Sequence, residues 1–178
     1  MAIFAWKTTH YPTLQDYLVA LLPFRKPTWI SGIVLHHTVS PLRSTWRGER
    51  TMAAMARYYR DRLGWPSGPH LFLVAGAPNP AHDGIWAGTP LADIGVHATS
   101  ANRYAIGIEI VGNYDREPWP SAVADLTYGT LTALARWGKM APSRIIGHRE
   151  VPGTIKSCPG RMIDMRVVRA EVGRRLKG

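Results

Sequence analysis

The sequence has very little cysteine and no long apolar run. Cys158 is the single cysteine among 178 residues, so an internal disulfide is excluded and the fold does not depend on oxidation. The apolar stretch at residues 17–24 is too short to span a bilayer. The first residues lack the basic region followed by an apolar run that marks a secretory signal. We therefore expect synthesis in the cytoplasm, with release by another agent if the target lies outside the cell.

Internal repeats, low-complexity runs and Ser/Gly-rich linkers are also missing, which argues against several independent units. With 178 residues, 46% of them hydrophobic, the chain suits one domain with a sizeable core. Acidic residues are scarce: 12 Asp and Glu stand against 22 Lys and Arg, a formal net charge of +10. Such a charge attracts nucleic acids, anionic membranes or anionic cell walls, or simply gives a soluble basic surface. The seven tryptophans are scattered, unlike the basic and aromatic pattern of a nucleic-acid groove.

Hydrophobic periodicity predicts strands that alternate with helices. Strands are expected at residues 30–36, 70–75, 84–88, 105–111 and 144–148. Helices are expected at residues 13–22, 49–63 and 121–140, and from about residue 161 to residue 176. We expect an α/β fold with a single domain, in which a mixed central β-sheet of about five to six strands is flanked by helices. Residues 1–29 are interpreted as an N-terminal extension with a short helix.

Three positions carry side chains of the kind that bind zinc. His36 ends the first buried strand, His148 ends the last short strand, and Cys158 follows in a loop that contains prolines and glycines. Because side chains alternate along a strand, His36 and His37 point to opposite faces. Two imidazoles and one thiolate would leave the fourth position of zinc for water, as hydrolysis requires. Spacing alone leaves the alternative open, namely hydrogen-bonded structural histidines and a buried thiol.

A carboxylate interrupts the apolar strand at residues 105–111. Glu109 shares one face of this strand with Gly107, whereas the three isoleucines share the other. A carboxylate is costly to bury unless it is paired or close to a metal, so an ion pair with an arginine is the alternative role. Gly107 is expected to leave room for a ligand. Lys156 can stabilise negative charge on a carbonyl oxygen, or it is a solvated loop lysine.

Five segments together resemble the type-2 N-acetylmuramoyl-L-alanine amidases, a superfamily of phage endolysins, bacterial recycling amidases and animal peptidoglycan recognition proteins. They are IVLHHT at 33–38, GPHLFL at 68–73, GVHATSAN at 95–102, AIGIEIVGNY at 105–114 and GHREVPGTIKSCPG at 147–160. PHLF, GIW and GVHATSAN look most like the endolysin branch. The resemblance implies an enzyme that cuts peptidoglycan between N-acetylmuramic acid and L-alanine, with residues 30–178 as its zinc amidase domain. The alternative is a recognition module that binds peptidoglycan without cutting it and typically lacks the thiolate ligand.

The positions of these motifs imply the roles of individual residues. The resemblance places one Zn²⁺ ion on His36, His148 and Cys158, and assigns catalysis to Glu109 and Lys156. Glu109 would take the proton of the attacking water and later pass it to the leaving amine. Lys156 and the zinc would stabilise the oxyanion.

The sequence departs from the family pattern at one position. Many members carry a catalytic tyrosine just before the histidine that matches His70, but Pro69 stands there in this chain. The tyrosine-based mechanism is therefore not implied, and Glu109 is the natural substitute. His97, Asn102 and His70 are candidate substrate-binding residues. Hydrogen bonds that hold loops are the alternative role, and we favour it for His70.

Cations gather in the C-terminal segment, which contains the last predicted helix. They are Arg161, Arg166, Arg169, Arg174, Arg175 and Lys177. We expect this helix to draw the protein to anionic cell-wall polymers or an outer membrane, and a solvated helix face is the alternative. The expected partner is peptidoglycan rather than nucleic acid, and the expected form is a monomer. The resemblance implies a bacteriolytic, antimicrobial endolysin that acts on the cell wall after release in a phage or prophage setting.

Overall fold

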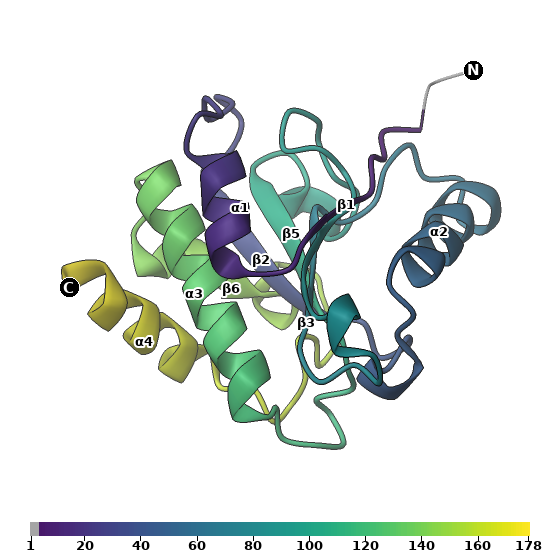
Figure 1. Cartoon of the computed structure of the whole chain (residues 1–178). Helices are drawn as coiled ribbons and strands as arrows, with labels where there is room; N and C mark the ends of the chain where they lie inside the picture. Colours follow the sequence, from purple (N-terminus) through teal and green to yellow (C-terminus); the bar gives the residue numbers. More distant parts are fainter. Residues whose placement is uncertain (1–3) are drawn as a thin grey trace.

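A mixed sheet of six strands organises the chain in the computed structural model, which describes residues 4–178 (Figure 1). The strands are β1 (Thr9–Tyr11), β2 (Gly32–His37), β3 (Leu71–Val74), β4 (Gly84–Ala87), β5 (Ala105–Ile110) and β6 (Ile145–Gly147). The α-helices are α1 (Leu14–Leu21), α2 (Glu49–Arg57), α3 (Ser121–Gly138) and α4 (Met165–Lys177). The expected α/β fold, one domain with a mixed sheet flanked by helices, is confirmed.

The strand order is β1-β4-β3-β5-β2-β6. β3, β5, β2 and β6 are parallel, whereas β4 and β1 run antiparallel to their neighbours. The carboxyl ends of the parallel strands therefore meet at one edge of the sheet. In this register His36 of β2 lies opposite Glu109 of β5, and Phe72 of β3 lies on the other side of Glu109. Two of the candidate site residues, His36 and Glu109, thus lie side by side at that edge.

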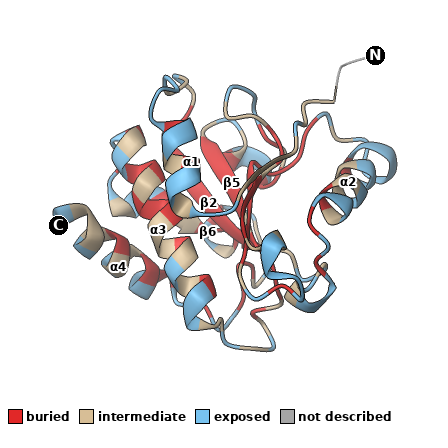
Figure 2. Cartoon of the chain, in the orientation of Figure 1, coloured by how far each residue is buried: buried red, intermediate tan, exposed pale blue. Residues whose placement is uncertain are grey.

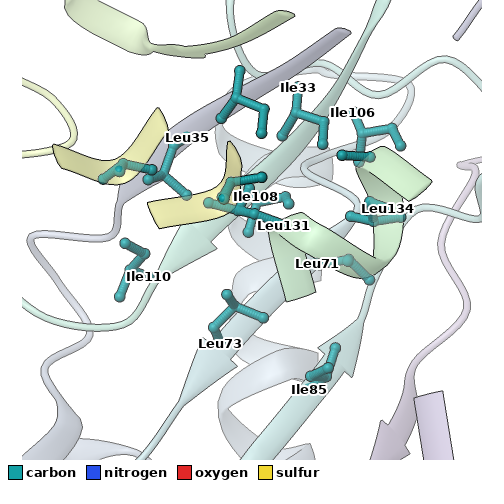
Figure 3. Close-up of a cluster of buried hydrophobic side chains, with 14 of the residues drawn as sticks. Ile33, Leu35, Leu71, Leu73, Ile85, Ile106, Ile108, Ile110, Leu131 and Leu134 are labelled. Atoms are coloured by element: carbon teal, nitrogen blue, oxygen red, sulfur yellow. The ribbon is translucent and has the colours of Figure 1, made fainter. Parts of the chain in front are cut away.

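The two faces of the sheet have different coverings (Figure 1). On one face α1, α3 and α4 pack over branched aliphatic side chains, which Figure 3 shows around Leu131 and Leu134 of α3. The strand residues of this core are Ile33, Leu35, Leu71, Leu73, Ile85, Ile106, Ile108, Ile110 and Ile145. On the other face Met52 of α2 packs with Phe72 and Trp86. Because both faces are covered, the residues of β2, β3 and β5 are buried, with the exception of the half-buried Glu109 (Figure 2).

The helix predicted at residues 49–63 is not α-helical throughout. Beyond Arg57 it continues as a π-helical turn, Tyr58–Arg62, in which the Leu63 N–H donates to the Tyr58 carbonyl. Such turns occur mostly as single insertions in α-helices and are frequent at functional sites. Gly64 follows with a φ of 65°, a left-handed conformation that glycine adopts without strain, and it ends the helix as the sequence predicts.

The described part of the N-terminal extension belongs to the same sheet. β1, which the sequence analysis missed, pairs with β4, and the His10 ring stacks on Trp86 with centroids 4.0 Å apart. α1 begins as predicted, because Thr13 and Asp16 form a reciprocal capping box. α4 begins at Met165 rather than near residue 161, because the Asp164 side chain caps it there. Among residues 4–178, no helix has the length and apolar character needed to cross a membrane.

Candidate metal centre

Three buried side chains converge at the carboxyl edge of the parallel strands. His36 closes β2, His148 follows β6, and Cys158 lies in the loop beyond. The Nδ1 atom of His36 is 3.6 Å from the Cys158 Sγ atom, and the ring centroids of His36 and His148 are 4.5 Å apart. The potential ligand atoms of the three residues all lie within 4.8 Å of one another. Two nitrogens and one sulfur at this separation fit a tetrahedral zinc ion with one position left open.

His37 points away from this cluster, as the alternation along a strand predicts. Its Nδ1 atom accepts a hydrogen bond from the Tyr114 N–H at 3.1 Å, and its Nε2 atom lies 3.8 Å from the Asp115 carboxylate. His37 therefore holds the chain that follows β5. Of the adjacent pair, only His36 is available to the cluster.

The protonation states suit metal binding. Burial keeps the pKa of His36 well below its usual value, and burial together with Lys156 lowers the pKa of His148 to about 4. Both rings are therefore neutral at neutral pH, as ligation requires. Burial raises the pKa of the Cys158 thiol to about 12, with a further contribution from Glu109. A metal ion must consequently displace the thiol proton when it binds.

Glu109 faces the same space without a protein partner. Its Oε2 atom is buried and has no hydrogen-bond partner among residues 4–178. An ion pair with an arginine, the alternative role, is not found for it among these residues. Burial raises the pKa of Glu109 to about 8, against the opposing effect of the Lys156 ammonium. An unpaired buried carboxyl group beside a metal site is suited to accepting or donating a proton.

An open cavity of about 660 Å³ joins these groups to solvent. The three candidate ligands, Glu109 and Lys156 all line it. Lys156 is exposed in the loop before Cys158, and its charge acts on the pKa values of Glu109 and the three candidate ligands. The structure thus brings together all five residues to which the sequence assigned metal binding or catalysis.

The three candidate substrate-binding residues lie differently. His70 is fully buried, its Nδ1 atom accepts from the Gly107 N–H at 3.0 Å, and its Nε2 atom lies 3.2 Å from the Asp93 carbonyl. The Asn102 Oδ1 atom accepts hydrogen bonds from the backbone N–H groups of His97 and Ala98. In the described part of the chain, His97 alone of the three lines the cavity. The contacts of His70 and Asn102 are those of residues that hold loops.

Other residues of the cavity were missed by the sequence analysis. Tyr59, from the π-helical turn, lines it together with Trp65, and the two rings stack with centroids 5.4 Å apart. Gly68 makes room for the Tyr59 ring, because a Cβ atom there would lie 2.8 Å from the ring. The helical period places Tyr59 on the buried face of its helix, but nothing in the period shows that this face ends in a cavity. Pro69 also lines the cavity, at the position of the family's tyrosine.

Comparison with known proteins gives the family of the chain. The profile of a family described as N-acetylmuramoyl-L-alanine amidase matches residues 25–161. The chain belongs to this family. Its relatives include peptidoglycan-recognition protein SC2 of Drosophila simulans, which is 32% identical over 135 residues, or 75% of this chain and 70% of the relative. Peptidoglycan-recognition protein SC1a of Drosophila melanogaster is 28% identical over 134 residues, or 74% of this chain and 69% of the relative.

Solved structures share the fold of this family member. An endolysin N-acetylmuramoyl-L-alanine amidase, LysCS from Clostridium intestinale, superposes with a TM-score of 0.62 at 21% identity, over 81% of this chain and 84% of that one. Wild-type Drosophila PGRP-LB superposes with a TM-score of 0.60 at 22% identity, over 88% of this chain and 81% of that one. The fold is therefore common to an endolysin amidase and a recognition protein, so the function has to be argued from the residues of the site.

The cations of the C-terminal segment are largely engaged in ion pairs. Arg166 pairs with Asp164, Arg169 with Glu150, Arg174 with Glu171, and Arg175 with both Glu171 and Asp125. Arg161 and Lys177 make no such pair among residues 4–178. The positive charge available to an external polyanion on this helix is accordingly smaller than the sequence count indicates.

Proposed function

We propose that the protein is a zinc-dependent amidase that hydrolyses the bond between N-acetylmuramic acid and L-alanine in peptidoglycan. The observation that carries this proposal is the convergence of His36, His148 and Cys158 beside an unpartnered Glu109 in an open cavity. A recognition module needs a groove for the glycan peptide but has no use for a buried thiol within reach of two imidazoles. Membership in the amidase family supports the same substrate class.

The bound zinc ion would polarise the scissile carbonyl and lower the pKa of a water molecule. The carboxylate of Glu109 is placed to take the proton of the attacking water. The protonated Glu109 can then donate this proton to the leaving L-alanine nitrogen. The Lys156 ammonium, at the mouth of the cavity, stabilises the negative charge that develops on the carbonyl oxygen.

The cavity walls supply substrate contacts. Tyr59 and Trp65 present an aromatic surface on one side, and Lys156 lies in the loop that carries Cys158. Aromatic faces of this kind pack well against apolar groups, and the cation attracts an anionic substrate. We place the sugar and the first residues of the stem peptide between these walls, with the protein acting on the cell wall after its release.

The test is a Glu109→Gln substitution, which keeps size and hydrogen-bonding capacity but removes the proton-accepting group. We expect a loss of about 10²-fold to 10⁴-fold in the rate at which purified peptidoglycan releases new L-alanine amino groups. Zinc content, measured by atomic absorption, should remain at the wild-type level. Full activity of a zinc-loaded Glu109→Gln protein would refute the proton-transfer role.

A further inference from the structure

The hydrogen bonds of His97 determine which of its ring nitrogens donates and which accepts. Its Nε2 atom lies 3.0 Å from the Ala105 carbonyl oxygen, which can only accept. The Nε2 atom therefore carries the proton. In a neutral ring with its proton on Nε2, the Nδ1 atom has a free lone pair. That lone pair faces the Nε2 atom of His36 at 3.1 Å.

The hydrogen bond between His97 and His36 also determines which nitrogen of His36 carries a proton. Because His97 Nδ1 can only accept, His36 Nε2 must donate, and the single proton of the neutral His36 ring is used there. The His36 Nδ1 atom is left unprotonated, and it faces the Cys158 Sγ atom at 3.6 Å. In the metal-free protein the thiol can donate to it. Each member of the series Cys158, His36, His97 and Ala105 thus donates to the next.

We infer that His97 is a positioning residue, which selects the tautomer and the ring orientation of His36 so that Nδ1 is presented to the metal. The inference rests on the proposed zinc site and deepens it. Ligating histidines commonly donate their second N–H to a carboxylate, a carbonyl oxygen or water, and such partners influence metal affinity. Here the partner is a second neutral imidazole, which adds no charge to the site.

His97 is itself held in place by its surroundings. The Asn102 side chain accepts a hydrogen bond from the His97 backbone N–H at 2.9 Å. The ring lies over Gly107, where a Cβ atom would come within 2.4 Å of the His97 Cγ atom. The sequence led us to expect that Gly107 leaves room for a ligand, but the space beside it is occupied by the His97 ring. The planes of the His97 and His36 rings are inclined at 85°.

These contacts also separate the two roles that the sequence left open for His97. Although His97 lines the cavity, both of its ring nitrogens are already engaged, by His36 and by the Ala105 carbonyl. No polar atom of the ring is left to bind a substrate. The side chain consequently acts through His36 rather than on the substrate.

Two substitutions test the inference. His97→Leu keeps an apolar side chain over Gly107 but removes the acceptor, whereas His97→Asn places an amide oxygen near the position of Nδ1. Zinc affinity, measured by competition with a chromophoric chelator, should fall about 10-fold to 100-fold in His97→Leu. It should stay within a few-fold of wild type in His97→Asn. Leu134→Ala, a core substitution on the far face of the sheet, controls for general loss of stability and should leave zinc affinity unchanged.

A second measurement does not depend on zinc. In the metal-free wild type, ¹⁵N chemical shifts of the histidine rings should show His36 and His97 protonated at Nε2. In His97→Leu, the His36 ring should lose this single tautomer. Wild-type zinc affinity in His97→Leu, or a His36 proton on Nδ1 in the wild type, would overturn the inference. If the wild type bound no zinc but showed the expected tautomers, the proposed function would fail while the positioning role stood.

Discussion

Alternate residues of the same strands build two surfaces of opposite character. On the face covered by α1, α3 and α4, Ile33 and Leu35 of β2 and the isoleucines of β5 pack against α3. On the other face the same two strands contribute His36 and Glu109, which line the cavity. The aliphatic face is held by many similar contacts, so its members are interchangeable within limits of volume. The polar face depends on single atoms in fixed places, and each of its members has a separate consequence.

The largest effect is expected on the polar face, from Cys158→Ser. A serine hydroxyl stays protonated near neutral pH and does not replace a thiolate as a zinc ligand. We expect the protein to lose its zinc on dialysis and to release no stem peptides from peptidoglycan, with unchanged far-UV circular dichroism. Stoichiometric zinc together with normal activity in Cys158→Ser would show that the Cys158 thiolate is not needed as a zinc ligand.

The matching change on the aliphatic face is Leu131→Ala. Leu131 is fully buried against the sheet, so its truncation should lower the free energy of unfolding by about 2–5 kcal/mol. Urea denaturation measures this loss. Below the unfolding transition, zinc affinity and the rate of peptidoglycan cleavage should match the wild type. A specific loss of zinc in this variant would show that the two faces are not independent.

His70, whose ring centroid lies 5.9 Å from that of His97, gives a prediction about pH. Burial lowers the pKa of His70 to about 4, whereas an unfolded histidine titrates near its usual 6.5. Between these values the unfolded chain binds more protons, so stability is present above pH 6.5 and is lost as the pH falls toward 4. This residue alone should remove about 2 kcal/mol between pH 7 and pH 5.

His70→Asn isolates that contribution, because an asparagine Oδ1 atom can still accept from the Gly107 N–H. The variant should be less stable at pH 7, but its free energy of unfolding should decline less steeply with acidification than that of the wild type. Urea titrations at a series of pH values provide the comparison. Parallel profiles for the two proteins would mean that folding does not shift the pKa of His70.

The smallest effect is expected in α4, none of whose residues lines the cavity. Neutralising Arg174, Arg175 and Lys177 should weaken binding to isolated cell walls only slightly, since both arginines already pair with Glu171. Exposed ion pairs of this kind contribute about 0–1 kcal/mol, so stability should change little. Any loss of wall binding should disappear at high salt. A large loss that persists in high salt would point to a specific contact of α4 with the wall.

The sequence predicted most of the fold because its long periodic segments obey simple rules. The alternation in residues 105–111 correctly separates the isoleucines from Glu109, and the motif order correctly gathers His36, His148 and Cys158. β1 was not predicted, because a strand of three residues is too short to show hydrophobic periodicity. Its pairing also depends on β4, which lies far away in the chain. The π-helical turn was not predicted, because its apolar residues keep the spacing of an α-helix and only its hydrogen bonds differ.

Roles that depend on tertiary contacts could not be derived in advance. The glycine at position 107 signals a close approach, but the sequence does not say that the approaching group is the His97 ring. From the sequence, the cations of α4 are free to bind a polyanion. In the fold, Arg169 and Arg175 pair with Glu150 and Asp125, which belong to other elements. Likewise, the motif places His70 near the site, whereas only the fold shows that both of its nitrogens meet backbone groups.

The proposed function requires that zinc held by His36, His148 and Cys158 enables cleavage of the muramoyl–alanine bond. Purified peptidoglycan should be incubated with the protein, with and without a zinc chelator, and the new ends identified by mass spectrometry. We expect free stem peptides that begin at L-alanine, produced only without the chelator and restored by added zinc. Peptidoglycan that binds the protein yet stays intact in the presence of zinc would contradict the proposed function and leave a recognition module.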